Sequence, residues 1–160
     1  MTNELPWRRL VGAWRGRGEG SYPDVAPFRY LEHTVITVAA DWNMLHVVQE
    51  TWLDEGDGVK KKALHLETGL IMRKDDGSLL YSCAQDSGRT EVMVGKLSST
   101  SERSLRIDWE TTVHANDARL VRAGRTWSVE GDTLHYSGHL STVRTPEYRK
   151  HIEARLIRAA

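Results

Sequence analysis

The sequence lacks the features that mark secreted and membrane-spanning proteins. Cys83 is the only cysteine among 160 residues, which excludes an internal disulfide and is typical of a reducing compartment. No apolar run approaches the roughly 18 residues of a transmembrane helix, and no charged-then-apolar leader stands at the start. We therefore expect a cytoplasmic protein without a membrane-spanning segment.

An excess of charge of either sign is also missing. Lysine and arginine number 22, as do aspartate and glutamate, so the formal net charge is +0. A chain with no overall field has no electrostatic means of attracting nucleic acid or an anionic membrane. We expect neither as a partner, and the composition leaves open whether the chain is a monomer or a homodimer.

Sustained helical periodicity is absent, and alternation with a period of two takes its place. It is clearest at 28–38 and 105–113, where apolar and polar residues alternate as in strands with one buried face. Similar segments bounded by turn residues recur at 44–53, 62–73, 79–84, 90–97, 119–129 and 133–141. We predict one all-β domain over 1–160, a single antiparallel barrel of about ten strands, because closure leaves no exposed strand edge.

Two short segments fall outside this pattern. Residues 5–11 carry Pro6 near their start, where proline is tolerated in a first helical turn. Near the end, 145–148 favours a turn or the opening of a short helix, and 151–158 fits either a last strand or a helical turn. We expect short helical turns at the N-terminus and before the last strand.

Glycine is concentrated in one predicted strand, at 12–22. Gly16, Gly18 and Gly20 would share a strand face there, because alternate residues of an extended strand point to the same side. A bare face marks either a sharp bend of the sheet or the close approach of a ligand to the backbone, and this stretch alone favours neither. The dinucleotide fingerprint G-x-G-x-x-G is excluded, because Ser21 takes the third glycine position.

Catalytic side chains have few candidates. No serine or cysteine can be tied by spacing to one of the seven histidines, so nucleophilic hydrolysis has no positive signal. Cys83 lies in an apolar strand, which favours a buried structural thiol over a nucleophile. His65 and Glu67 share a strand face, which fits either a site or an ordinary surface pair.

Five motifs follow one another along the chain: Gly12-x-Trp14-x-Gly16-x-Gly18-x-Gly20-x-Tyr22-Pro23, Pro27-Phe28-x-Tyr30-x-Glu32, His65-x-Glu67-Thr68-Gly69, Ala84-Gln85-x-x-Gly88-x-x-Glu91-Val92 and His151-Ile152-x-Ala154-x-Leu156. Together they resemble the nitrobindin family, whose small lipocalin-like or fatty-acid-binding-protein-like barrels hold a b-type haem. The resemblance spans nearly the whole chain. Its first motif is the most specific because of its length.

The resemblance implies a ferric haem b whose iron is held by a single histidine, which corresponds to His151. Members of the family bind nitric oxide and are described as isomerising peroxynitrite to nitrate. Haem and small nitrogen oxides are therefore the implied partners. In such a reaction the iron carries the chemistry, and the protein supplies axial ligation, orientation and access.

Further residues take roles around the haem only through this resemblance. Those that would line the pocket are Leu64, His65, Gln85 and Leu140. The glycine face of the first strand, including Gly16 and Gly18, would let the flat macrocycle approach the backbone. Arg119, or its neighbour Ala118, falls near a basic residue that serves the haem propionates in some members.

Two features depart from the family pattern. Asp24 stands where many members carry a threonine that meets a propionate, so we expect repulsion between two carboxylates there. His151 would share a strand face with Glu153 and Arg155 in a regular strand, so a pocket-facing His151 requires a helical turn or a bulge at that point. Asp24 favours the alternative of a haem-free barrel that binds a fatty acid or another small apolar ligand.

Overall fold

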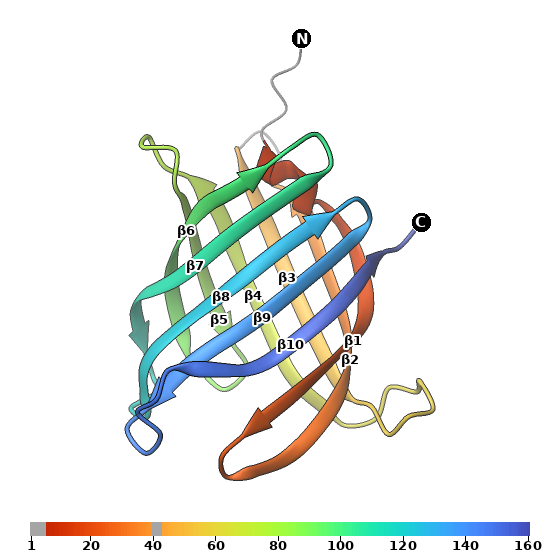
Figure 1. Cartoon of the computed structure of the whole chain (residues 1–160), viewed down its shortest axis with the longest axis vertical. Coiled ribbons are helices and arrows are strands. Elements are labelled where there is room, and N and C mark those ends of the chain that lie inside the picture. The colour runs from red at the N-terminus through yellow and green to blue at the C-terminus, as the bar shows by residue number, and fades with distance from the viewer. Residues whose placement is uncertain (1–5, 40–42) are drawn as a thin grey trace.

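The computed structural model describes residues 6–39 and 43–160, and these form a closed barrel of ten antiparallel strands (Figure 1). Around the barrel the order is β1-β10-β9-β8-β7-β6-β5-β4-β3-β2. A 3-10 helix, η1 (Pro6–Leu10), precedes strands β1 (Gly12–Tyr22), β2 (Val25–Val38), β3 (Met44–Leu53), β4 (Ala63–Arg73), β5 (Leu79–Gln85), β6 (Thr90–Thr100), β7 (Ser104–Ala115), β8 (Leu120–Glu130), β9 (Thr133–Thr142) and β10 (Arg149–Arg158). The predicted all-β barrel is confirmed.

The alternation read from the sequence sorts side chains between the inside and the outside of the barrel. In β7, Leu105, Ile107 and Trp109 are buried, whereas Arg106 and Glu110 are exposed. Apolar burial of this kind contributes roughly 25 cal/mol per Å². The hydrophobic pattern therefore sets the register, because a slip of one residue would turn every apolar side chain of the strand outward.

The glycines of β1 serve barrel closure and packing. A Cβ at Gly16 would collide with the backbone of Arg155 in the paired strand β10, and a Cβ at Gly18 would collide with the ring of Tyr30 from β2. The bare strand face is thus covered by protein. This corrects the expectation that a flat ligand meets the backbone at Gly16 and Gly18, since neither glycine lines the cavity described below.

Replacing Gly18 by alanine should lower the free energy of unfolding by about 1 to 3 kcal/mol, the usual cost of overpacking. The ring of Tyr30 has little freedom to yield, because its hydroxyl lies 2.7 Å from that of Tyr136. Urea unfolding measures the difference, and Arg15→Ala on the exposed face of the same strand is the control. Equal stability of Gly18→Ala and wild type would show that Tyr30 moves aside without cost.

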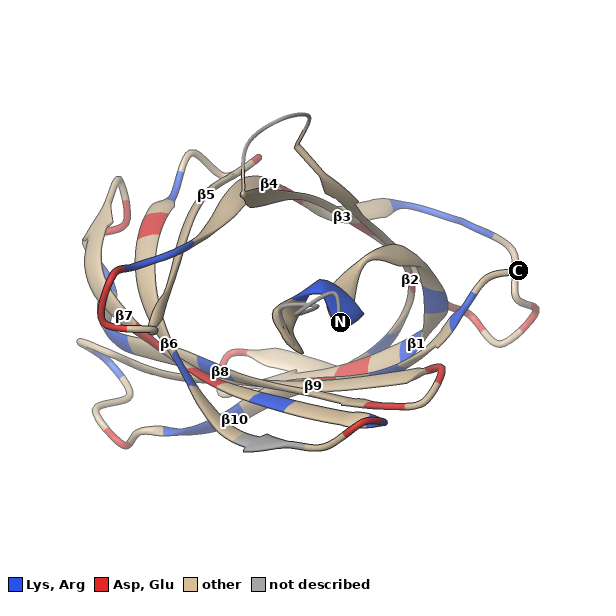
Figure 2. Cartoon of the chain, turned by 90° about the horizontal axis from the view of Figure 1, so that it is seen from above, with Lys and Arg blue, Asp and Glu red and all other residues tan. Residues whose placement is uncertain are grey.

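Helix η1 closes one end of the barrel, and Figure 2 shows it lying within the ring of strands. Trp7 and Leu10 are buried there, and the indole of Trp14 donates a hydrogen bond to the Leu10 carbonyl at 2.8 Å. The helical turn expected before the last strand is not found, because the chain from β9 to β10 passes through bends only. Within 6–39 and 43–160, no helix has the length and apolarity needed to cross a membrane.

Candidate functional site

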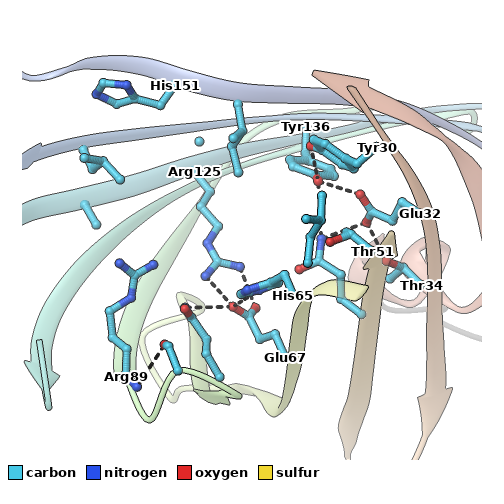
Figure 3. A pocket seen from close by; sticks show the side chains of 18 of the residues that line it. Tyr30, Glu32, Thr34, Thr51, His65, Glu67, Arg89, Arg125, Tyr136 and His151 are labelled. Carbon is cyan, nitrogen blue, oxygen red and sulfur yellow. Dashed lines mark hydrogen bonds and ion pairs between the residues drawn. The ribbon is translucent and has the colours of Figure 1, made fainter. Parts of the chain in front are cut away.

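A cavity of about 610 Å³ lies inside the barrel, and its lining includes Val25, Lys62 and Ser87 at the β1–β2, β3–β4 and β5–β6 connections. Figure 1 shows these connections at the end of the barrel opposite η1. The apolar wall of the cavity includes Val25, Phe28, Leu64, Leu140 and Ile152. Polar side chains from several strands complete the lining (Figure 3). A cavity of this volume with an apolar wall and a few polar groups is typical of a site for a small ligand or cofactor.

The structure brings together most of the residues that the resemblance placed around a ligand. Those that line the cavity are Leu64, His65, Gln85, Leu140 and His151. They come from four strands, β4, β5, β9 and β10. The His65 side chain faces this cavity, so the interpretation of His65 and Glu67 as an ordinary surface pair is wrong.

Two charged residues lie elsewhere. Asp24 is exposed in the turn between β1 and β2 and does not contribute to the cavity lining. Arg119 is 81% exposed, and its Nε lies 3.2 Å from Oδ1 of Asp117. The side chain of Arg119 is therefore directed into solvent by a local ion pair, and the placement of a basic group in the pocket at this position is corrected.

His151 enters the cavity because β10 is irregular at this point. The pairing of β10 with β9 shifts register between Lys150 and Ile152, and a bulge of this kind re-aims a side chain that regular alternation would point outward. The bulge that a pocket-facing His151 requires is thus present. The His151 side chain is buried, and its ring stacks on Tyr22 with centroids 5.1 Å apart.

The hydrogen bond of His151 to the backbone defines its tautomer. Nδ1 lies 2.8 Å from the carbonyl oxygen of Ser21, and a carbonyl can only accept, so Nδ1 carries the proton. In the neutral ring Nε2 then holds a free electron pair. Nε2 is buried, and no polar atom of the described residues hydrogen-bonds to it. A buried nitrogen in this state is suited to coordinate a metal.

A buried ion pair crosses the cavity near His65. Arg125 donates to both carboxylate oxygens of Glu67, at 2.6 and 2.8 Å, and Tyr81 donates to Glu67 at 2.8 Å. Burial is the largest influence and would raise the pKa of Glu67, but the charges and hydrogen bonds of Arg125 and His65 together outweigh it and hold that pKa well below its usual range. Glu67 is thus an anion whose role is to hold the guanidinium in place.

Glu91 extends this ionic network to a second arginine. It accepts hydrogen bonds from Gln85 at 2.9 Å and from Thr111 at 2.9 Å. Oε2 of Glu91 lies 3.4 Å from Arg125 and 3.4 Å from Nε of Arg89. Two guanidinium groups therefore meet at one carboxylate on the cavity wall.

Glu32 lies in a different part of the cavity and has a different environment (Figure 3). Its carboxyl group accepts from Thr34 at 2.6 Å, Gln49 at 2.8 Å and Tyr136 at 2.5 Å. No lysine or arginine of the described chain forms an ion pair with it. Burial raises the pKa of Glu32, and these hydrogen bonds offset the rise only in part. The barrel therefore contains two buried carboxyl groups whose pKa values are shifted in opposite directions, upward for Glu32 and downward for Glu67.

Cys83 lies beside this network as a buried thiol. Burial raises its pKa to about 12, which keeps the thiol protonated and agrees with the predicted structural role. Its sulfur, with Glu67 and Glu91, forms a cluster whose atoms lie within 4.8 Å. Because both carboxylates already bind guanidinium groups, the cluster is an ionic network rather than a ready metal site.

Some site residues were missed in the sequence although a signal for them exists. Arg125 falls between Ala123 and Trp127 on the inward face of its strand, and Glu32 falls between Tyr30 and Thr34 in the same way. A charged residue in an inward position must be paired or neutralised, which marks it as part of a site. The partner itself is not readable, because it comes from a distant strand.

Comparisons with known proteins agree with this geometry. Residues 3–158 match the model of the THAP4-like, heme-binding beta-barrel domain. A protein named peroxynitrite isomerase 2 from Mycobacterium bovis is 32% identical over 142 residues, covering 86% of this chain and 84% of that protein. A peroxynitrite isomerase from Arabidopsis thaliana is 28% identical over 149 residues, covering 93% of this chain and 84% of the relative.

A solved structure gives the same answer for the fold. The crystal structure of Rv2717c from Mycobacterium tuberculosis superposes with a TM-score of 0.85 at 30% identity, covering 98% of this chain and 99% of that chain. The family model and the relatives together cover most of the chain, including β10 with His151. The chain therefore belongs to the family of THAP4-like, heme-binding β-barrel domains, the nitrobindin family.

Proposed function

We propose that this chain binds haem b in the cavity with His151 as the axial ligand to iron, binds nitric oxide, and isomerises peroxynitrite to nitrate. The observation that carries the proposal is the buried, unsatisfied Nε2 of His151 on the cavity wall. The ring is held by the Ser21 carbonyl and by stacking on Tyr22, and metal-ligating histidines are commonly held by a hydrogen bond to their other ring nitrogen. Family membership and the names of the relatives support the same function.

The remaining residues of the cavity fit a haem group. Leu64, Leu140 and Ile152 offer apolar surface to a macrocycle, and His65 and Gln85 add polar groups. When bound, ferric haem supplies an iron that can coordinate a small nitrogen oxide. Isomerisation of peroxynitrite rearranges the atoms of one anion without a second substrate, so the side chains have to hold, orient and shield the reactants rather than supply a general base.

Asp24 does not argue against this function as its sequence position suggested. Its carboxylate is exposed and lies outside the cavity lining, so water and salt screen its repulsion of a propionate. The haem-free alternative, a barrel for a fatty acid, leaves Nε2 of His151 unexplained.

The proposal predicts a saturable Soret band when hemin is added to the purified protein, because coordination by a histidine changes the spectrum of the porphyrin. The expected stoichiometry is one haem per chain, and the loaded ferric protein should convert added peroxynitrite to nitrate faster than free hemin does. An environment-sensitive lipid probe is titrated in parallel. Uptake of the probe with no saturable hemin band would contradict the proposal and favour the apolar-ligand alternative.

A further inference from the structure

Two of the buried side-chain nitrogens without a hydrogen-bond partner line the same cavity. One is Nε2 of His151, and the other is Nε of Arg89. The two atoms are chemically opposite, since the histidine nitrogen offers an electron pair and the arginine nitrogen offers a proton. Buried polar groups are nearly always satisfied, so an unsatisfied group on a cavity wall indicates a missing ligand atom.

The contacts of Arg89 hold its position without using its donors. Nε lies 3.4 Å from Glu91 and Nη1 lies 3.5 Å from Asp117. Over the part of the chain that the structure describes, both contacts are ion pairs, and the guanidinium of Arg89 donates no hydrogen bond. Glu91 and Asp117 therefore balance the charge of Arg89, while its buried Nε–H still lacks a hydrogen-bond acceptor.

The neighbouring groups strengthen the positive end of the cavity. Figure 3 shows the guanidinium groups of Arg89 and Arg125 across the pocket from His151. Both lie 3.4 Å from the same oxygen of Glu91, so one carboxylate oxygen pairs with two positively charged groups. Arg125 is occupied by Glu67, which leaves Arg89 as the guanidinium with open donors.

We propose that Arg89 binds a small oxyanion of the nitrite, nitrate and peroxynitrite class in the cavity, opposite His151. A planar guanidinium matches two oxygens of such an anion with two parallel hydrogen bonds. The identity of the anion rests on the proposed function, but the site itself rests on the free donors of Arg89. Arg89 would thus select an anionic substrate and hold it where a haem iron can reach it.

The test compares Arg89→Gln with wild type in ferric, hemin-loaded protein at constant ionic strength. Soret shifts give the dissociation constants for nitrite, an oxyanion, and for imidazole, a neutral ligand. Loss of a charge-assisted hydrogen bond should weaken nitrite binding on the order of 10-fold or more, with imidazole affinity unchanged within about 2-fold. Arg89→Lys should recover part of the nitrite affinity, because lysine keeps the charge and loses the fork. Arg106→Gln, on the outer face of β7, is the charge-matched control.

A second experiment measures the binding of nitrate to the haem-free protein by titration calorimetry. Heat of binding in wild type that is absent in Arg89→Gln supports the site even when no hemin band forms, whereas a missing hemin band counts against the proposed function alone. Equal anion affinities of wild type and Arg89→Gln in both arms would overturn the inference. Weaker hemin binding with unchanged nitrite affinity would also overturn it, because the guanidinium would then serve a haem propionate.

Discussion

His151→Leu is expected to remove the Soret band that hemin gives with the wild-type protein, or to weaken hemin binding on the order of 100-fold or more. Loss of a group that only hydrogen-bonds to a metal ligand costs roughly 10- to 100-fold in metal affinity, and this substitution removes the proposed ligand atom itself. Leucine fills similar space on the cavity wall but offers no electron pair. A hemin titration followed at the Soret maximum measures the loss.

Two further variants separate ligation from a general effect on the cavity. His65→Leu changes another cavity histidine, whose ring lies 3.7 Å from Glu67, and it should keep the His151-type spectrum. His151→Gly should lose the spectrum and regain it with added imidazole, provided that circular dichroism shows a folded barrel. An unchanged spectrum in His151→Leu would mean that another residue holds the iron.

Glu67→Gln should lower the free energy of unfolding at pH 7 by about 3 to 5 kcal/mol, the cost of leaving a buried charge without its partner. The amide carries no charge and keeps one acceptor oxygen, so Arg125 would lose its neutralising anion and one of two short hydrogen bonds, with Glu91 left at 3.4 Å. The Glu67 carboxylate is 1% exposed, so water cannot take its place. Urea unfolding with linear extrapolation gives the difference.

Glu32→Gln is the matched comparison, because it makes the same substitution at a second buried carboxyl group. Burial raises the pKa of Glu32 above its ordinary value of 4.5, so the folded protein holds a proton that the unfolded chain releases. From pH 4.5 up to the folded pKa, this group lowers wild-type stability by about 1.4 kcal/mol per pH unit. Glu32→Gln removes that loss and should equal or exceed wild-type stability at pH 7.

The contribution of Glu67 to stability depends on pH in the opposite sense. The pKa of Glu67 is lowered in the folded state, so its stabilising contribution is fully present above pH 4.5 and is lost as the pH falls toward the folded pKa. The difference between wild type and Glu67→Gln should therefore shrink in acid, while that between wild type and Glu32→Gln should change with pH in the other sense. Equal effects of both substitutions at pH 7 would contradict the opposite pKa shifts of the two carboxyl groups.

The sequence located most of the barrel because the information for a strand is local. Alternation at 105–113 identified the buried face of β7, and turn residues such as Gly77 and Gly131 take positive φ where the strands reverse. The motif around His151 supplied, by resemblance, the ligand position that we propose. The alternation could not supply the direction of the His151 side chain, because in a regular strand His151 would lie on the same face as Glu153.

The partners of the charged interior residues were beyond the sequence for a different reason. Arg125 and Glu67 are 58 positions apart in the sequence, and Tyr136 and Glu32, which share a hydrogen bond, are 104 positions apart. Such pairs form only when the closed barrel places their strands opposite each other. The local pattern indicates that the Arg125 side chain points inward, but the closure of the barrel and the register of its strands decide which side chain it contacts.

The glycine-rich strand β1, His151 and Arg119 show what the sequence determined and what it did not. Sequence by itself determined the fold class, the position of nearly every strand, and a set of residues that surround one cavity. Only the tertiary structure decided that Tyr30 covers the bare face at Gly18, that a bulge turns His151 inward, and that Arg119 points to solvent. The physical reason is that periodicity specifies which face of a strand is buried, whereas packing across the barrel specifies what is buried against it.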